Sequence, residues 1–147
     1  MVFRFRLIGT DEHPFYRDFE IMENQTFFDF HTAILDELGY AKNQLASFFL
    51  ADDNWEKGLE INLFDMAEDS FTPVTDMDIK LHELIGGRNR RLLYVFDFFS
   101  DRAFYLELNM VIPPGNDKDY PCCISGSGAP PRQTIIPGSR PDFNGKQ

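Results

Sequence analysis

The stretch that decides the fold runs from Arg91 to Ile112 and reads RLLYVFDFFSDRAFYLELNMVI. Its second half alternates between two faces with a period of two. One face carries Phe104, Leu106, Leu108 and Met110, and the other carries Tyr105, Glu107 and Asn109. Such alternation is typical of a half-buried strand, and the Ser-Asp pair between two apolar runs suits a tight connection. We therefore predict a long antiparallel hairpin.

Toward the N-terminus, two more alternating runs predict a second hairpin. They are VFRFRLIG, residues 2–9, and FYRDFEIM, residues 15–22, with a turn around Pro14. An amphipathic helix should follow, because Thr26 and Asp29 have the spacing of a capping box and Gly39 is placed to end it. Its apolar stripe consists of Phe27, Phe30, Ile34 and Leu38.

The middle and the end of the chain give weaker patterns. LASFFLA, residues 45–51, predicts a short buried strand, and an acidic insertion at about residues 51–76 is expected to be irregular with one further short strand. A second short helix is predicted over residues 77–85, with Asp76 as its cap and Gly86 and Gly87 at its end. From Pro113 to Gln147, seven prolines and five glycines predict an irregular tail.

Together these elements predict an α+β fold in a single domain, with the order ββαβ, insertion, α, ββ. The sheet should be mainly antiparallel or mixed, with the helices on one face. We place the core domain at residues 1–112 and expect residues 113–147 to pack on it as a Pro/Gly-rich tail with a flexible extreme end. The chain has 147 residues, enough for one domain, and its 16 Phe predict an aromatic core.

Charge and hydropathy bear on location and partners. The N-terminus has no uninterrupted apolar region, and no stretch approaches the roughly 20 apolar residues of a membrane span. These observations predict a cytoplasmic protein without membrane association. The net charge of −10 disfavours nucleic acid as a partner. The best basic patch is Arg88, Arg90 and Arg91, which is either a phosphate contact or a solvated turn before a strand.

The segment YPCCISGSGAPPRQ, from Tyr120 to Gln133, allows three interpretations. A phosphate loop would need a Lys, a hydroxyl residue and a following helix, which Pro130 and Pro131 prevent. A metal or redox site is disfavoured because adjacent cysteines seldom bind one ion and form a strained disulfide. We therefore predict no cofactor and no metal, and a tail stiffened by proline that packs over the sheet. Its structural residues would be Tyr120, Pro121, Cys123, Gly126, Pro130 and Pro131, with Cys123 pointing inward.

Few residues are candidates for chemistry. His31 lies near the apolar stripe of the predicted helix, and Asp97 interrupts an apolar strand, so the two could form an acid/base pair, with Glu107 or Tyr94 nearby. The alternative is a satisfied structural polar pair, or an Asp at the solvent edge of the strand. Trp55 lies among charges, and it is either an interface anchor or part of a lid packed on the core. The surrounding DDNWEKGLE lacks the ligand spacing of a calcium loop.

Three segments in this order, FDFHTAILDELGY, LLYVFDFF and YPCCISGSGAPP, resemble the plasmid open-reading-frame-three-like family. The resemblance covers nearly the whole chain and implies a compact α+β domain of unknown function, sometimes labelled as an insertion-element passenger with a resolvase-like name. This chain departs from the family pattern after the second segment. Where relatives tend to carry Gly, Asp, Trp and His, it has Phe99, Ser100, Arg102 and Phe104, and Arg132 and Gln133 replace acidic residues in the tail.

These observations lead to three functional hypotheses. The leading one is a non-enzymatic module that binds another protein, through the sheet edge of its hairpins or through the insertion around Trp55. The second is a hydrolase-type enzyme that uses His31 and Asp97. The third, suggested by the family label, is a DNA accessory protein of a mobile element. It would need a continuous positive surface built from Arg4, Arg6, Arg88, Arg90 and Arg91. The oligomeric state stays open.

Overall fold

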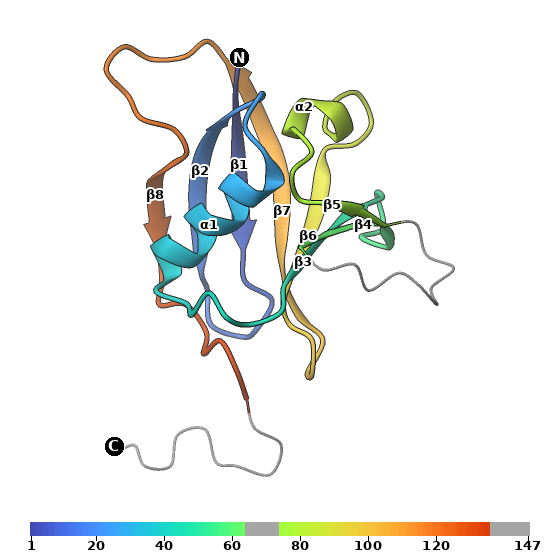
Figure 1. The fold of residues 1–147 in the computed structure, drawn as a ribbon. Coiled ribbons are helices and arrows are strands. Elements are labelled where there is room, and N and C mark those ends of the chain that lie inside the picture. The colour runs from blue at the N-terminus through green and yellow to red at the C-terminus, as the bar shows by residue number, and fades with distance from the viewer. Residues whose placement is uncertain (64–73, 136–147) are drawn as a thin grey trace.

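In the computed structural model, which describes residues 1–63 and 74–135, eight strands form one sheet (Figure 1). The sheet order is β5-β4-β3-β6-β7-β1-β2-β8, and every neighbouring pair is antiparallel except β4 and β5. The strands are β1 (Val2–Ile8), β2 (Tyr16–Met22), β3 (Ser47–Ala51), β4 (Lys57–Asn62), β5 (Val74–Asp76), β6 (Arg91–Asp97), β7 (Arg102–Ile112) and β8 (Cys122–Ser127). The α+β class and the mixed sheet are as predicted.

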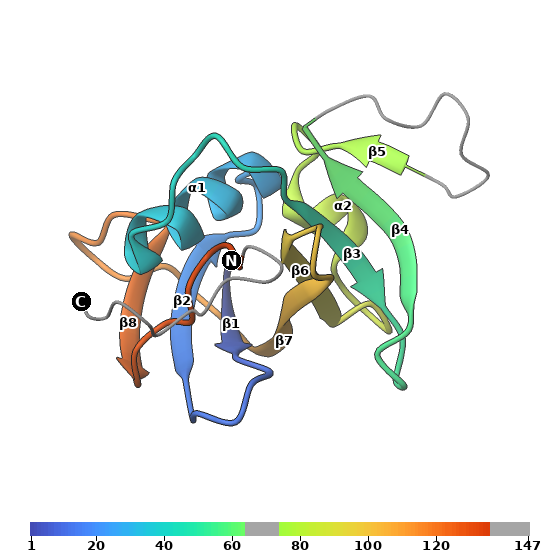
Figure 2. The same cartoon turned by 90° about the horizontal axis from the view of Figure 1, so that it is seen from below.

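Two helices, α1 (Phe27–Leu38) and α2 (Leu81–Leu84), lie on the same side of the sheet (Figure 2). The predicted capping box of α1 is confirmed, since Thr26 accepts a hydrogen bond from the Asp29 amide and Asp29 accepts one from the Thr26 amide. Gly39 ends the helix with a φ of 69°, in the left-handed region that glycine adopts without a steric cost.

Both predicted hairpins are confirmed by their strand pairing. In β1 and β2, Phe5 lies opposite Phe19, and in β6 and β7, Tyr94 lies opposite Phe104. One residue of the predicted pattern is on the other face: the register of β7 against β1 shifts after Leu108, so Met110 lies opposite the outward-facing Arg4 and is exposed. A bulge of this kind turns the following side chain to the opposite face.

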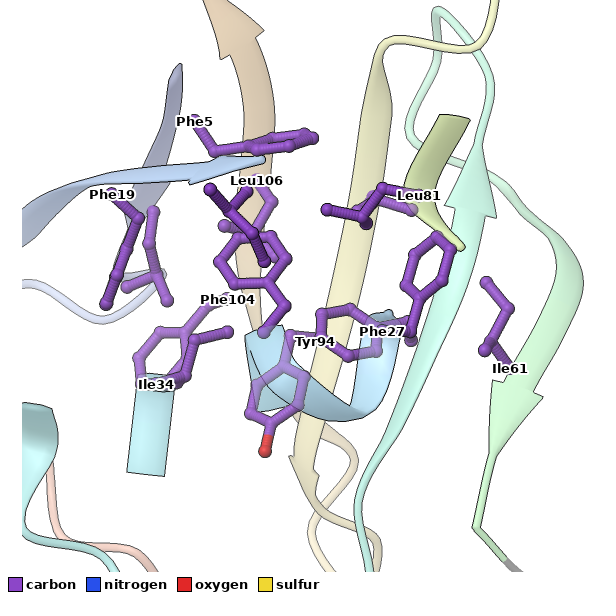
Figure 3. Packing of buried hydrophobic residues seen from close by; sticks show 14 of the residues in the cluster. Phe5, Phe19, Phe27, Ile34, Ile61, Leu81, Tyr94, Phe104 and Leu106 are labelled. Carbon is purple, nitrogen blue, oxygen red and sulfur yellow. The ribbon is translucent and has the colours of Figure 1, made fainter. Parts of the chain in front are cut away.

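The main core lies between the sheet and the helices, and phenylalanine is its most frequent residue (Figure 3). Phe30 of α1 stacks on Phe48 of β3 with ring centroids 5.6 Å apart, and Phe96 stacks on Phe104 at 4.3 Å. Leu81 of α2 is fully buried in the same cluster. Edge-to-face and offset ring contacts add to the hydrophobic gain of burial, so this cluster sets how the helices pack on the sheet.

Between β3 and β6 the structure differs from the prediction in the number of strands and in the length of the helix. The insertion contributes two strands, β4 and β5, where one was expected, and its residues 64–73 lie outside the described part of the chain. The second helix is also shorter than predicted. Residues before Leu81 do not join it because their backbone has other partners: the Met77 amide donates to the Asn62 carbonyl, and the Phe28 amide donates to the Met77 carbonyl.

The prediction that the tail is irregular is wrong for residues 122–127, which form β8 and pair antiparallel with β2. Side chains attach β8 and the segment before it to β2, since Ser125 of β8 donates to Asp18 over 2.7 Å and the ammonium of Lys118, four residues before β8, lies 2.5 Å from Glu20. The strand therefore depends on distant contacts, and no alternation in CCISGS indicates it. Residues 136–147 lie outside the described part of the chain.

Candidate functional site

A pocket of about 370 Å³ lies at the turn between β6 and β7, and we call it the hairpin-tip pocket. Its volume falls in the range of small binding sites, roughly 300 to 1,000 Å³. Most of its lining is apolar. The lining residues are Gln44, Leu45, Phe96, Asp97, Phe98, Phe99, Thr134 and Ile135.

The pocket is assembled from three segments that are far apart in sequence. Tyr40 packs its ring on Phe96 at 5.7 Å and donates its hydroxyl to the Pro131 carbonyl. Gln133 then makes two hydrogen bonds to the backbone of Ala41, of 2.7 and 2.9 Å. These contacts hold the chain after β8 beside the segment that follows α1, and so Thr134 and Ile135 complete the wall of the pocket.

Asp97, one of the two predicted catalytic residues, lines this pocket but is already engaged. It is buried, and one of its oxygens accepts a 3.0 Å hydrogen bond from Arg102 Nε while the other accepts from the Ser100 amide. Arg102 also donates to the carbonyls of Arg132 and Gln133. The Asp97 carboxylate thus stabilises the hairpin turn and, through Arg102, the position of the tail.

The rim of the pocket carries exposed apolar side chains. Phe99 is 95% exposed, and Phe98 and Leu45 are exposed as well. Single exposed apolar residues are ordinary, but a group of them around an apolar hollow is typical of interaction sites. This pocket is not among the sites predicted from the sequence. The signal that could have found it is the FDFF stretch at the hairpin turn, where the alternation cannot bury three Phe side chains on one face.

His31, the second predicted catalytic residue, has a different partner. Its Nδ1 lies 2.7 Å from the Tyr94 hydroxyl, and the imidazole is only 4% exposed. Burial, with a smaller effect of Lys42, lowers the pKa of His31 to about 4. Burial also raises the pKa of Tyr94. Within the described part of the chain no hydrogen bond joins His31 to Asp97: His31 pairs with Tyr94, and Asp97 pairs with Arg102.

Trp55 lies on the face of the sheet opposite the helices, half buried over a small second core of Phe49, Ala51, Leu93 and Val95. Its ring stacks on Tyr105 with centroids 4.5 Å apart, and the Arg91 guanidinium lies 4.9 Å from the ring centre. A stacked aromatic pair capped by a guanidinium is a stable packing unit. Trp55 therefore belongs to a packed surface cluster.

Several of the arginines that a DNA-binding surface would need are bound to acidic or carbonyl groups. Arg91 binds Glu107 and the Asp53 carbonyl, and Arg90 donates to the Leu108 carbonyl, while Arg88 is exposed. The other two arginines lie on β1. Arg4 binds Glu20 at 2.7 Å, and Arg6 makes two hydrogen bonds to Asp18 of 2.8 and 2.9 Å. Three of the five arginines, Arg4, Arg6 and Arg91, are thus paired with a carboxylate.

The two carboxylates on β2 are strongly held in their charged form. The Arg6 hydrogen bond lowers the pKa of Asp18 against the opposing effect of burial, with help from Ser125. Burial alone would raise the pKa of Glu20, but hydrogen bonds from Lys118 and Arg4 outweigh it and lower that pKa. The network links β1, β2, β8 at Ser125 and the segment before β8 at Lys118.

Both cysteines of the tail are partly buried. Cys122 and Cys123 are free thiols, burial raises the pKa of both, and Cys123 packs half buried against the main core. A raised pKa reduces the thiolate fraction on which cysteine reactivity depends. At Gly126, an added Cβ would lie 2.5 Å from the Cδ atom of Arg17, so glycine lets that side chain cross the strand.

Among residues 1–63 and 74–135, no group of three or more His, Cys, Asp or Glu is arranged to hold a metal ion. In the same residues, no helix has the length and hydropathy needed to cross a membrane.

Comparisons with known proteins identify the family of the chain and a solved structure with a similar fold. No curated protein sequence matches the chain. Among solved structures, the crystal structure of MM3350, a protein of unknown function from Methanosarcina mazei Go1, is similar. Its TM-score is 0.70 at 23% identity, and the match covers 85% of this chain and 68% of that one. At this identity the likeness shows the fold alone. The family model described as "Plasmid pRiA4b ORF-3-like protein" matches residues 1–137. The resemblance seen in the three sequence segments is thereby confirmed, and the chain belongs to the plasmid pRiA4b ORF-3-like family.

Proposed function

We propose that this protein is a non-enzymatic module that binds another protein by accepting an apolar side chain of that partner in the hairpin-tip pocket. The observation that carries the proposal is Phe99, which is 95% exposed beside an apolar hollow. Covering a fully exposed Phe gains roughly 1.5 to 3 kcal/mol, and aromatic residues next to a pocket are common anchors of protein interfaces. A partner segment over the rim would cover Phe98 and Leu45 at the same time.

The proposed surface differs from the two surfaces predicted from the sequence, the sheet edge of the hairpins and the insertion around Trp55. The four strands of the two hairpins, β1, β2, β6 and β7, each have a neighbouring strand on both sides, so none of them offers a free edge to a partner. Trp55 is stacked on Tyr105, so it offers less unpaired aromatic surface than Phe99. The hairpin-tip pocket is therefore the better place for a partner.

The other two functions have less support. A hydrolase would need a general base close to its acid, whereas His31 faces Tyr94 and Asp97 faces Arg102. A DNA accessory protein would need free cations, and Arg4, Arg6 and Arg91 each bind a carboxylate. The net charge of −10 also disfavours binding to DNA.

The test is to select peptides from a displayed library of random 12-residue sequences on the full chain, and to compare two variants. Phe99→Ser removes the anchor at the pocket. Phe28→Ser is the matched control, because Phe28 is also an exposed phenylalanine, 43% exposed, but lies on α1 and does not line the pocket. We expect selected peptides rich in apolar residues to lose at least tenfold in affinity for Phe99→Ser and little for Phe28→Ser. Equal binding to both variants, or no enriched peptide, would contradict the proposal.

A further inference from the structure

Strand β8 forms one edge of the sheet (Figures 1 and 2). It pairs with β2 on one side, and within the described residues no strand pairs with its other side. An edge strand presents unpaired backbone N–H and C=O groups, and proteins commonly shield such edges with Lys, Pro or charged side chains. The six residues of β8, CCISGS, include none of these. A single bulge, where the register against β2 shifts between Asp18 and Phe19, interrupts the strand at Ile124.

A groove of about 440 Å³ follows this edge, and we call it the β8 groove. One wall is formed by residues of β8 and of the turn after it. Its other wall is an ion pair between Arg17 of β2 and Glu37 of α1, 3.3 Å apart. The residues from β8 and its turn are Cys123, Ile124, Ser125, Gly126, Ser127 and Gly128.

The edge is held in position before any partner arrives. Ser125 is bound to Asp18, Arg17 donates to the Ser127 carbonyl over 3.1 Å, and Gln25 donates to the Tyr120 carbonyl over 2.8 Å. A strand that is already ordered does not lose further conformational entropy when it binds, which favours association.

We propose that β8 accepts an extended segment of a partner protein as an added strand, whose side chains on one face enter the β8 groove. Only another polypeptide backbone complements a row of unpaired backbone donors and acceptors, so the ligand is a peptide strand. The occupant is a different protein and not a second copy, since two chains that each carry a net charge of −10 repel one another. This site goes beyond the hairpin-tip pocket and uses other residues.

The test again uses random 12-residue displayed peptides on the full chain, with variants that act on β8. Ile124→Lys places a shielding charge on the edge strand. Ile8→Lys is the matched control, because Ile8 is 39% exposed against 38% for Ile124 but lies on β1, which has neighbours on both sides. We expect a class of peptides that loses at least tenfold in affinity for Ile124→Lys and keeps its affinity for Ile8→Lys and Phe99→Ser. N-methylation at alternate positions of such a peptide should abolish binding, because those amides would pair with β8.

Three results would overturn the proposal: no peptide depends on Ile124, N-methylation has no alternating effect, or sedimentation velocity shows a dimer that Ile124→Lys dissociates. Amide hydrogen exchange on the unmodified protein tests the same proposal without depending on whether the Ile124→Lys variant folds correctly. Saturation with the peptide should slow exchange in residues 122–127, and unchanged exchange there would also refute the added strand. Because the Phe99 and Ile124 variants remove different sites, failure here is distinguishable from failure of the proposed function.

Discussion

Replacing His31 with Asn should make the protein less sensitive to mild acid. The imidazole is 4% exposed between α1 and the sheet, with its Nδ1 on the Tyr94 hydroxyl, and burial lowers its pKa from 6.5 to about 4. Asn offers a polar atom close to the position of Nδ1 and does not titrate. The substitution therefore removes the proton equilibrium and keeps a partner for Tyr94.

The direction in which stability changes with pH follows from the lowered pKa of His31. Above pH 6.5 His31 is neutral in both the folded and the unfolded chain. Proton uptake then does not favour the unfolded chain, and the free energy of unfolding has its full value. As the pH falls toward 4, the unfolded chain takes up a proton that the folded protein does not, and stability is lost. With these two pKa values, the loss between pH 7 and pH 4.5 is about 2.5 kcal/mol, at 1.36 kcal/mol per pKa unit.

The assay is urea unfolding followed by circular dichroism at both pH values, for the natural protein and for His31→Asn. We expect the free energy of unfolding of the natural protein to fall by about 2.5 kcal/mol more than that of the variant between pH 7 and pH 4.5. The comparison cancels every other group that titrates in this range. If the two proteins lose the same stability, His31 is not buried in its neutral form and the proposed geometry is wrong.

Two further predictions concern the attachment of the tail. Glu20→Gln should lower stability by about 2 kcal/mol, because Glu20 is 1% exposed and accepts charged hydrogen bonds from Arg4 and Lys118. The exposed counterpart Glu107→Gln should cost less than about 1 kcal/mol in the same urea unfolding experiment, and equal losses would disprove this account. Gly128→Ala should cost more than about 1 kcal/mol, because φ is +86° and the new Cβ would lie 2.2 Å from the Pro14 carbonyl oxygen. A thermal melt that matches that of Ser127→Ala would contradict this.

Local patterns predicted the elements whose structure depends on near neighbours. The hairpin of β6 and β7 and the helix α1 were identified because alternation, the capping box of Thr26 and Asp29, and the stop at Gly39 all lie within a few residues of one another. The second helix was overestimated because the backbone of Met77 bonds to residues distant in sequence, which no local pattern reveals.

The sites were harder to predict for the same reason. Strand β8 exists because Asp18 and Glu20 reach across to Ser125 and Lys118, and its own sequence has no strand pattern. The hairpin-tip pocket needs Ile135 to be carried back beside Leu45, about ninety residues earlier in the chain. The predicted pair of His31 and Asp97 required a particular register of α1 against β6. Only the packing of the core determines that register.

The most direct test of the binding proposal is photocrosslinking in the cells that make the protein, with benzoylphenylalanine in place of Phe99 in one variant and of Phe28 in another. The proposal predicts a discrete crosslinked partner from position 99 that is absent from position 28 and disappears when Leu45→Asp is added to the first variant. The same crosslinks from both positions, or none from position 99, would contradict a protein-binding role for the hairpin-tip pocket.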